Sequence, residues 1–171
     1  KENVAIADPD NSGYKLNGGE LRSRGFEFTA QGHILPNWSV YASYAYTDTK
    51  VLDSDSLPEG SRFRGIPLNS GSLWLVHTHH EGPLCGLRLG AGLYAADSRL
   101  GDNNGTFELP GYATFDLMAG YKRDLGENKI FNTQLNIHNV LDREYYESSA
   151  SATAVMPGTP LTATLSIGFE F

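Results

Sequence analysis

The chain has 171 residues and a formal net charge of -7. Its Lys and Arg residues are scattered, which excludes a nucleic-acid-binding surface, because phosphate binding needs clustered positive charge. No window approaches the ~18 consecutive apolar residues of a membrane helix, and the single cysteine, Cys85, excludes an internal disulfide and a cysteine metal cluster.

The composition indicates strands and turns, because the chain holds 19 Gly, 9 Tyr and 8 Phe and no long run of helix-forming residues. Residues 1–7 are predicted to end a strand, and residues 8–13 form a turn cluster. The spacing D-x-D-x-S-G in this cluster resembles the start of a calcium loop, but position twelve would be Gly19 instead of Glu. A plain turn is therefore favoured over a calcium site.

Seven further strands are predicted from apolar and polar residues that alternate with a period of two. They cover residues 20–32, 38–50, 70–80, 86–97, 111–122, 131–146 and 159–171. The last is the most regular and reads T-P-L-T-A-T-L-S-I-G-F-E-F, with apolar residues on one face and Thr, Ser, Gly and Glu on the other. In residues 70–80 the facing is ambiguous, because Leu73, Trp74, Leu75 and Val76 run together.

The connections alternate in length, which is typical of outer-membrane β-barrels with short periplasmic turns and long external loops. Short ones are predicted at 36–37, 81–85 and 124–129, and long ones at 51–69, 98–110 and 147–158. The sequence therefore predicts an all-β fold, a transmembrane antiparallel β-barrel with Phe171 at the periplasmic rim. A soluble sandwich with one solvated face is the alternative.

Several segments in order resemble TonB-dependent outer-membrane receptors, and the ferrichrome-like hydroxamate branch most of all. They are N-V-L-D-R-E-Y-Y (139–146), G-E-L-R-S-R-G-F-E-F (19–28), S-Y-A-Y-T-D (43–48), N-S-G-S-L-W (69–74), G-L-R-L-G-A-G (86–92) and D-N-N-G-T-F-E-L-P-G-Y (102–112). The resemblance implies that residues 1–171 are a C-terminal segment, about the last eight strands of a barrel of about 22 strands, without the plug domain. The loop after residue 146 lacks the cysteine pair frequent in that branch, which leaves the ligand open.

The resemblance also implies a function: uptake of ferric siderophores across the Gram-negative outer membrane, energised through TonB. The ferric siderophore is then cargo, with no covalently bound cofactor and no enzymatic activity. The implied partners are the siderophore, the TonB complex through an N-terminal part outside this chain, the lipid bilayer with its lipopolysaccharide, and the barrel-assembly machinery. A self-contained eight-stranded barrel with a structural or adhesive role is the alternative. The small inward residues Gly90, Gly92, Gly120 and Gly168 favour the wide barrel, because they would leave voids in a narrow one.

Aromatic and Arg side chains in the long loops are the candidates for ligand contact, because they pack against a chelate or meet its charge. They are Arg62, Phe63, Arg64, Arg99, Phe107, Tyr146 and Met156. A solvated loop residue is the alternative for each of them.

A second set is interpreted as a fold signature: Asn139, Asp142, Tyr145, Tyr146 and Phe171. Asn139 and Asp142 are expected to bond local backbone where the strand bends, and both tyrosines to anchor at the outer interface. The resemblance assigns Phe171 to the signal for barrel assembly.

Other polar residues suggest no chemistry. His77, His79 and His80 have no carboxylate at a defined spacing to complete a metal site, and no G-x-S-x-G motif is present. Glu27, Asp116 and Glu170 are expected to pair with lumen arginines such as Arg88 or with the absent plug.

Overall fold

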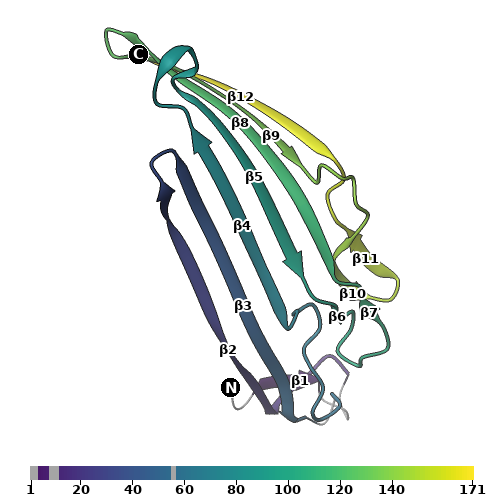
Figure 1. The fold of residues 1–171 in the computed structure, drawn as a ribbon. Coiled ribbons are helices and arrows are strands. Elements are labelled where there is room, and N and C mark those ends of the chain that lie inside the picture. The colour runs from purple at the N-terminus through teal and green to yellow at the C-terminus, as the bar shows by residue number, and fades with distance from the viewer. Residues whose placement is uncertain (1–3, 8–11, 55–56) are drawn as a thin grey trace.

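The computed structural model describes residues 4–7, 12–54 and 57–171. Eight strands form one antiparallel sheet in chain order, curved and elongated (Figure 1). They are β1 (Val4–Ala7), β2 (Lys15–Leu35), β3 (Trp38–Asp53), β4 (Asn69–Thr78), β5 (Leu87–Ala96), β8 (Tyr112–Gly126), β9 (Lys129–His138) and β12 (Thr162–Glu170). All eight predicted strands are present, although the seventh is shorter than predicted. Of the predicted turn cluster at residues 8–13, residues 8–11 lie outside the described residues, and Ser12 and Gly13 form a turn.

Short and long connections lie at opposite ends of the sheet, as predicted. The loops at residues 57–68, 97–111 and 139–161 gather at the lower end of Figure 1, and the short turns lie at the upper end with the C-terminus. The turn between β4 and β5 holds a 3-10 helix, η1 (Gly82–Leu84). In the described residues no helix is long and apolar enough to cross a membrane.

Two small hairpins in the long loops were not predicted. β6 (Arg99–Leu100) pairs with β7 (Glu108–Leu109), and β10 (Tyr146–Ser151) pairs with β11 (Ala154–Pro157). Both lie at the loop end of the sheet (Figure 1), so two of the long connections are partly ordered by their own hydrogen bonds.

The strand register separates the side chains into two faces. Leu73 lies opposite Ala42 and Leu93, and Trp74 opposite Tyr41, so the ambiguous β4 places Leu73 and Leu75 on the apolar face. That face carries these residues across the sheet: Phe26, Phe28, Val40, Ala42, Tyr44, Leu73, Leu75, Leu89, Ala91, Leu93, Phe115, Leu117, Leu135, Ile137, Leu165, Ile167 and Phe169. None of these is charged.

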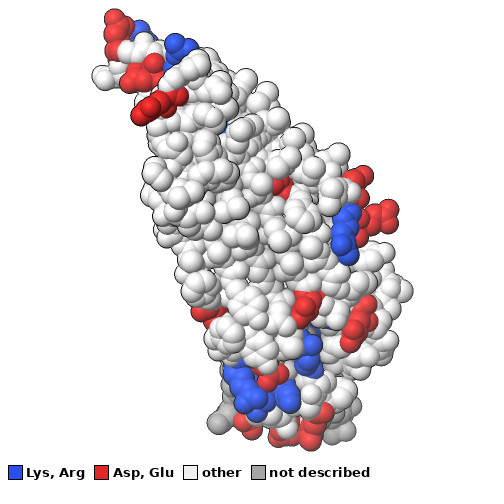
Figure 2. Space-filling view, viewed as in Figure 1, with Lys and Arg blue, Asp and Glu red and all other residues white. Residues whose placement is uncertain are grey.

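The apolar face is exposed in this chain. Phe26, Leu165 and Phe169 are each more than half exposed. In water, such exposure costs about 25 cal/mol of free energy per Å² of apolar surface. Charged side chains gather toward the ends of the face seen in Figure 2, and its middle carries few of them. A soluble sandwich would cover this face with a second sheet, but the other described sheets are the two small hairpins. A surrounding bilayer accounts for the exposure.

The sheet is open in the described part of the chain. β1 and β12 are its two edges, and they pair with β2 and β9 respectively. The predicted pairing of the last strand with the seventh is therefore confirmed. The alternative of a self-contained eight-stranded barrel fails, because closure would require β1 to pair with β12.

The seventh strand is shorter than predicted. It was expected to continue to residue 146, but β9 ends at His138. Asn139 and Asp142 have φ values of 50° and 46°, in the left-handed region that breaks a strand and that Asn and Asp adopt more readily than most residues. The chain therefore turns away from the sheet at the start of the third long loop.

Candidate functional site

A buried arginine joins the second and third long loops at the mouth. Arg99 is only 3% exposed. Its Nη2 donates to the carbonyl oxygens of Tyr146 at 2.5 Å and Glu147 at 2.9 Å, and its guanidinium carbon lies 5.3 Å from the centre of the Tyr112 ring. Because charge-assisted hydrogen bonds are stronger than neutral ones, Arg99 holds the β6–β7 hairpin against the β10–β11 hairpin.

The first long loop joins the same layer. Arg64 Nη1 donates to the Ala150 carbonyl at 2.6 Å, and the Gly65 N–H donates to the Leu100 carbonyl at 2.8 Å. Ser149 Oγ donates to the Gly101 carbonyl at 2.5 Å. All three loops thus contact one another, although they are far apart in the chain.

Three tyrosines form a row on the polar face of the sheet beneath these loops. The ring centres of Tyr94 and Tyr112 are 5.8 Å apart, and those of Tyr112 and Tyr145 are 4.3 Å apart with 25° between the planes. The register places Tyr94 opposite Thr114, on the same face as Asp116. The tyrosine row, Tyr94, Tyr112 and Tyr145, therefore faces the side that would be the lumen of a barrel.

Tyr145 corrects one interpretation from the sequence. It was expected to anchor at the outer interface, but its ring stacks on Tyr112 from the polar side. The ring also lies against the backbone of Gly158, where an added Cβ would come within 2.1 Å of it. Because β9 ends before the N-V-L-D-R-E-Y-Y segment, the strand alternation no longer determines where Tyr145 points.

A polar pair adjoins the tyrosine row. Asp116 Oδ2 lies 3.1 Å from His138 Nδ1, and Asp116 Oδ1 accepts the Asn139 N–H at 2.9 Å. With Tyr145 these residues line a hollow of about 300 Å³ that opens on the polar face. Asp116 was expected to pair with an arginine such as Arg88, but Arg88 Nη2 donates to Gln134 Oε1 at 3.1 Å instead.

Asn139 and Asp142 hold the bend that follows. Asn139 Nδ2 donates to the carbonyls of Arg143 at 2.9 Å and Thr159 at 3.1 Å, and its Oδ1 accepts the Arg143 N–H at 3.0 Å. Asp142 Oδ1 accepts the Leu161 N–H at 2.8 Å. These side chains bond the backbone at both ends of the third long loop.

The proposed ligand-contact residues differ in exposure. Tyr146 and Met156 are 47% and 63% exposed, and both lie on the β10–β11 hairpin. Arg99 is buried, and Arg64 is exposed but engaged with Ala150.

The other three are partly buried. Arg62 Nη2 donates to the Ile66 carbonyl at 3.3 Å, the Phe63 N–H donates to Thr49 Oγ1 at 3.1 Å, and the Phe107 ring packs on Gly101. The structure brings Arg64, Arg99 and Tyr146 into one layer, and their contact with a ligand stays a prediction.

The sequence had not singled out Tyr94 and Tyr112 as site residues. Tyr94 alternates with apolar neighbours and shares the face of Arg88 and two glycines. A large aromatic residue on the polar face was the signal that could have identified it.

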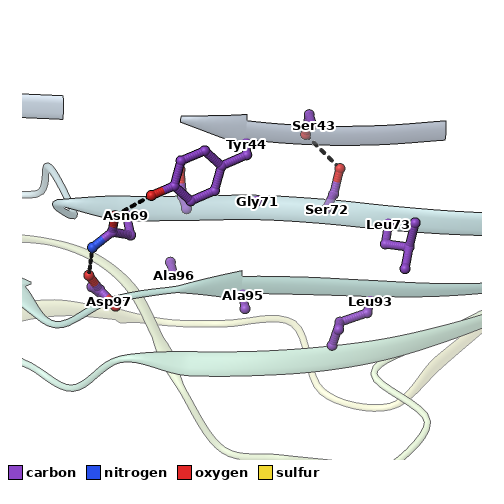
Figure 3. Close-up of a pocket in the computed structure, with 11 residues that line it drawn as sticks. Ser43, Tyr44, Asn69, Gly71, Ser72, Leu73, Leu93, Ala95, Ala96 and Asp97 are labelled. Atoms are coloured by element: carbon purple, nitrogen blue, oxygen red, sulfur yellow. Dashed lines mark hydrogen bonds between the residues drawn. The ribbon is translucent and has the colours of Figure 1, made fainter. Parts of the chain in front are cut away.

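A shallow groove of about 370 Å³ lies outside the lumen, on the apolar face (Figure 3). Gly71 lies opposite Ala95, in the pair next to Leu73 and Leu93, and these two small residues leave the space that forms the groove. At one end, Tyr44 Oη donates to Asn69 Oδ1 at 2.5 Å, and Asn69 Nδ2 donates to Asp97 Oδ2 at 2.6 Å. The groove is thus apolar along Leu73 and Leu93 and has a polar end, where Tyr44, Asn69 and Asp97 are joined by hydrogen bonds.

The histidines near the short turns pack as aromatic rings. The ring centres of His77 and His79 are 4.5 Å apart, and Trp38 lies 4.8 Å from His77. Among the described residues no group of three or more His, Cys, Asp or Glu side chains is placed to hold a metal ion.

Comparisons with known proteins agree with this architecture. Residues 1–140 match the family model described as TonB dependent receptor-like, beta-barrel. The metal-pseudopaline receptor CntO of Pseudomonas aeruginosa is 38% identical over 172 residues, covering 100% of this chain and 24% of the relative. The ferrichrome outer membrane transporter/phage receptor of Escherichia coli K12 is 31% identical over 171 residues, covering 100% and 23%.

A solved structure shows the same fold. The siderophore receptor PiuA from Acinetobacter baumannii superposes with a TM-score of 0.77 at 26% identity, covering 98% of this chain and 24% of that one. The chain therefore spans about a quarter of the length of the relatives it matches.

Proposed function

This chain belongs to the TonB-dependent receptor-like β-barrel family. We propose that it forms a part of the barrel wall and of the external mouth of an outer-membrane receptor for ferric siderophores. Members of this family are receptors and transporters, not enzymes. Transport energy would come through TonB, which would act on a part of the receptor outside these residues. The long loops then face the medium, and Phe171 faces the periplasm.

The tyrosine row carries the proposal. Three rings on the polar face, directly under the linked loops, offer a stacked aromatic surface where a chelate enters the lumen. Aromatic rings bury much apolar area, and a tyrosine adds a hydroxyl that bonds polar groups of the ligand. The adjoining hollow with Asp116 and His138 supplies further polar contacts.

Two relatives suggest which chelates to test. One is named for metal-pseudopaline and the other for ferrichrome. Both ligands combine a metal centre with an organic shell, and a surface of rings and hydroxyls suits that shell better than it suits a bare ion. We favour a ferric siderophore as the cargo, and the barrel alone would hold no resident cofactor.

The test uses the whole receptor in a host that lacks other siderophore receptors. Uptake of radioactive iron is measured with ferrichrome and ferrioxamine B, and uptake of radioactive metal with metal-pseudopaline, before and after the protonmotive force is dissipated. Ferric siderophore uptake that stops on dissipation supports the proposal. If none of the iron chelates is taken up, the proposed cargo is wrong, and uptake of metal-pseudopaline alone would replace it.

A substitution ties transport to the tyrosine row. Tyr112→Ala is expected to raise the half-saturating chelate concentration roughly three- to tenfold, because it removes an aromatic contact, while Tyr112→Phe keeps most of the affinity. Tyr121→Ala on the apolar face is the control. Equal uptake by the Tyr112→Ala and Tyr121→Ala receptors at equal abundance in the membrane would contradict the assignment.

A further inference from the structure

The hollow beside the tyrosine row contains a carboxylate that no Lys or Arg neutralises. It is lined by Thr114, Asp116, His138, Asn139, Tyr145 and Thr159. The Asp116 side chain is 25% exposed, and in the part of the chain that the structure describes no Lys or Arg lies within ion-pair distance of it. A partly buried charge without a counter-ion costs free energy, so this carboxylate favours a cation that arrives from outside.

Asp116 keeps room for further hydrogen bonds. Its Oδ1 accepts the Asn139 N–H, and its Oδ2 lies 3.1 Å from His138 Nδ1. An ionised carboxylate has about four acceptor sites, so about two remain for a ligand. Thr114 and Thr159 add hydroxyl groups to the same walls. An ammonium group donates three hydrogen bonds, which suits a carboxylate flanked by hydroxyl oxygens.

The Tyr145 ring forms the aromatic wall of the hollow and also stacks on Tyr112. A cation within about 6 Å of the centre of a tyrosine ring is attracted to the face of that ring. The tyrosine row already holds one cation in this way, because the Arg99 guanidinium carbon lies 5.3 Å from the centre of the Tyr112 ring. Arg99 is not among the residues that line the hollow, so Tyr145 and Asp116 stay available to a second cation.

The long loops above the hollow carry more acidic than basic residues. In residues 57–68, 97–111 and 139–161, seven carboxylates stand against four arginines. A mouth with an excess of one sign of charge attracts ligands of the opposite sign. The entry to the hollow therefore favours a chelate that carries positive charge over an anionic one.

The hollow is large enough for an ammonium group and its alkyl stem. Its volume is about 300 Å³, roughly ten times the ~30 Å³ that one water molecule occupies in the liquid. Because Tyr145 belongs both to the hollow and to the tyrosine row, a chelate packed on the row places its periphery beside Asp116. The hollow and the row are thus adjacent parts of a single binding surface.

We infer that the hollow is a subsite for a primary ammonium group on the outer shell of the siderophore. Asp116 is its counter-ion, Tyr145 offers the face of its ring, and the tyrosine row packs against the rest of the chelate. The receptor then prefers a chelate with an ammonium group to a neutral or anionic chelate of similar size. The inference rests on the proposed function, because it adds the charge of the ligand to a site already assigned to a ferric siderophore.

The test compares two chelates that differ only in this group. Ferrioxamine B carries a terminal ammonium group, and its N-acetyl derivative carries a neutral amide in the same place. Binding to the purified whole receptor in detergent is measured by quenching of intrinsic fluorescence at about pH 8, where an ordinary imidazole is uncharged. Ferrioxamine B is expected to bind about tenfold more tightly, at the lower end of what a hydrogen bond to a charged group contributes, because Asp116 is partly exposed.

Two substitutions assign this preference to the hollow. Asp116→Asn keeps the shape of the side chain and an acceptor for the Asn139 N–H, and should lower the preference to less than about twofold. Tyr145→Leu should lower it roughly threefold through loss of the ring face, whereas Tyr145→Phe keeps most of it. A general loss of affinity through structural damage would weaken both chelates alike and leave their ratio unchanged.

Glu170→Gln is the control for a lost carboxylate. It removes an exposed negative charge from β12, at the end of the sheet with the short turns, and should keep the preference at about tenfold, because this charge is far from the hollow. A loss of preference in Glu170→Gln as large as in Asp116→Asn would show that the net charge of the receptor and not the hollow selects the ligand, and would overturn the inference.

The outcomes separate this inference from the proposed function. Equal affinities of the wild-type receptor for the two ferrioxamines overturn the inference. A preference that persists in Asp116→Asn overturns it as well, because the acetyl group would then be rejected for its bulk. Uptake of ferrichrome, which has no ammonium group, by a receptor that binds neither ferrioxamine contradicts the inference alone. A receptor that prefers ferrioxamine B in binding but takes up no iron chelate contradicts the proposed function alone, and one that binds no chelate contradicts both.

Discussion

Replacing Asn139 tests how the third long loop is held. The side chain is 3% exposed and makes three hydrogen bonds, to the N–H and carbonyl of Arg143 and to the carbonyl of Thr159. At about 1 kcal/mol each, their loss costs about 3 kcal/mol. The residue also has a φ of 50°, which Ala tolerates less well than Asn, by about 1 kcal/mol. Asn139→Ala should thus lower the local free energy of opening by about 4 kcal/mol.

Hydrogen exchange of the whole receptor in lipid vesicles measures this local opening. Amides of residues 139–161 should exchange at least a hundredfold faster in Asn139→Ala, since every 1.4 kcal/mol is tenfold. Asn139→Gly tolerates the φ value and should recover about 1 kcal/mol of the loss. Asn104→Ala, in an exposed loop, is the control. Exchange of residues 139–161 within tenfold of wild type in Asn139→Ala would refute the reasoning.

Three further changes probe other parts of the site. Gly92→Val would place Cβ 2.3 Å from the Trp74 ring, so the barrel should lose about 1–3 kcal/mol to overpacking and unfold at a lower temperature in a gel-shift assay. Arg99→Gln removes the charged donor between two hairpins, and protease cleavage of the loops should become at least tenfold faster. Hydrogen bonds from the Thr106 hydroxyl, then its N–H, lower the pKa of Asp102 below 3.8. The ionised Asp102 therefore stabilises the loop above pH 3.8, and this stabilisation is lost as the pH falls through the lowered pKa of the folded state. Cleavage of the loop by pepsin should become faster as the pH falls through that pKa. Asp102→Asn should abolish this pH dependence.

Each of these changes has a control in the same chain. Gly32→Val adds the same bulk where nothing lies within 4 Å of the new Cβ. Arg123→Gln removes an exposed cation far from the long loops, and Asp53→Asn an exposed carboxylate of β3. A change that matches its control would show that the contact invoked for it contributes little.

The alternation of side chains was sufficient to predict the sheet. The pairing of Leu165 with Leu135, and of Phe169 with Phe131, follows once both strands present their apolar face to the same medium. A shift of one residue would turn these side chains into the lumen, so the register is strongly specified. The parity of short and long connections then placed Phe171 and the long loops at opposite ends.

The mouth was much less predictable. Arg99 contacts the backbone of residues more than forty positions later, and no periodic pattern encodes such a contact. The sequence indicated a bend at Asn139 and Asp142 but kept it within a strand that ran to residue 146. Both residues have a positive φ, so β9 ends at His138 instead. Side chains at the mouth are therefore placed by tertiary contacts that only the structure reveals.

The N-V-L-D-R-E-Y-Y segment joins the fold to the proposed binding surface. The Asn139 N–H bonds Asp116, whose other oxygen faces His138, and the Asn139 side chain fixes the bend that brings Tyr145 onto Tyr112. A substitution of Asn139 should therefore weaken siderophore affinity because it moves the Tyr145 ring, although Asn139 itself does not contact the ligand. Asn139→Gly, which preserves the φ value, and Tyr145→Ala should each weaken siderophore affinity in uptake. The double variant should lose less binding free energy than the sum of the two single losses, because both changes disrupt one unit. Additive losses would mean that the bend and the tyrosine row act separately.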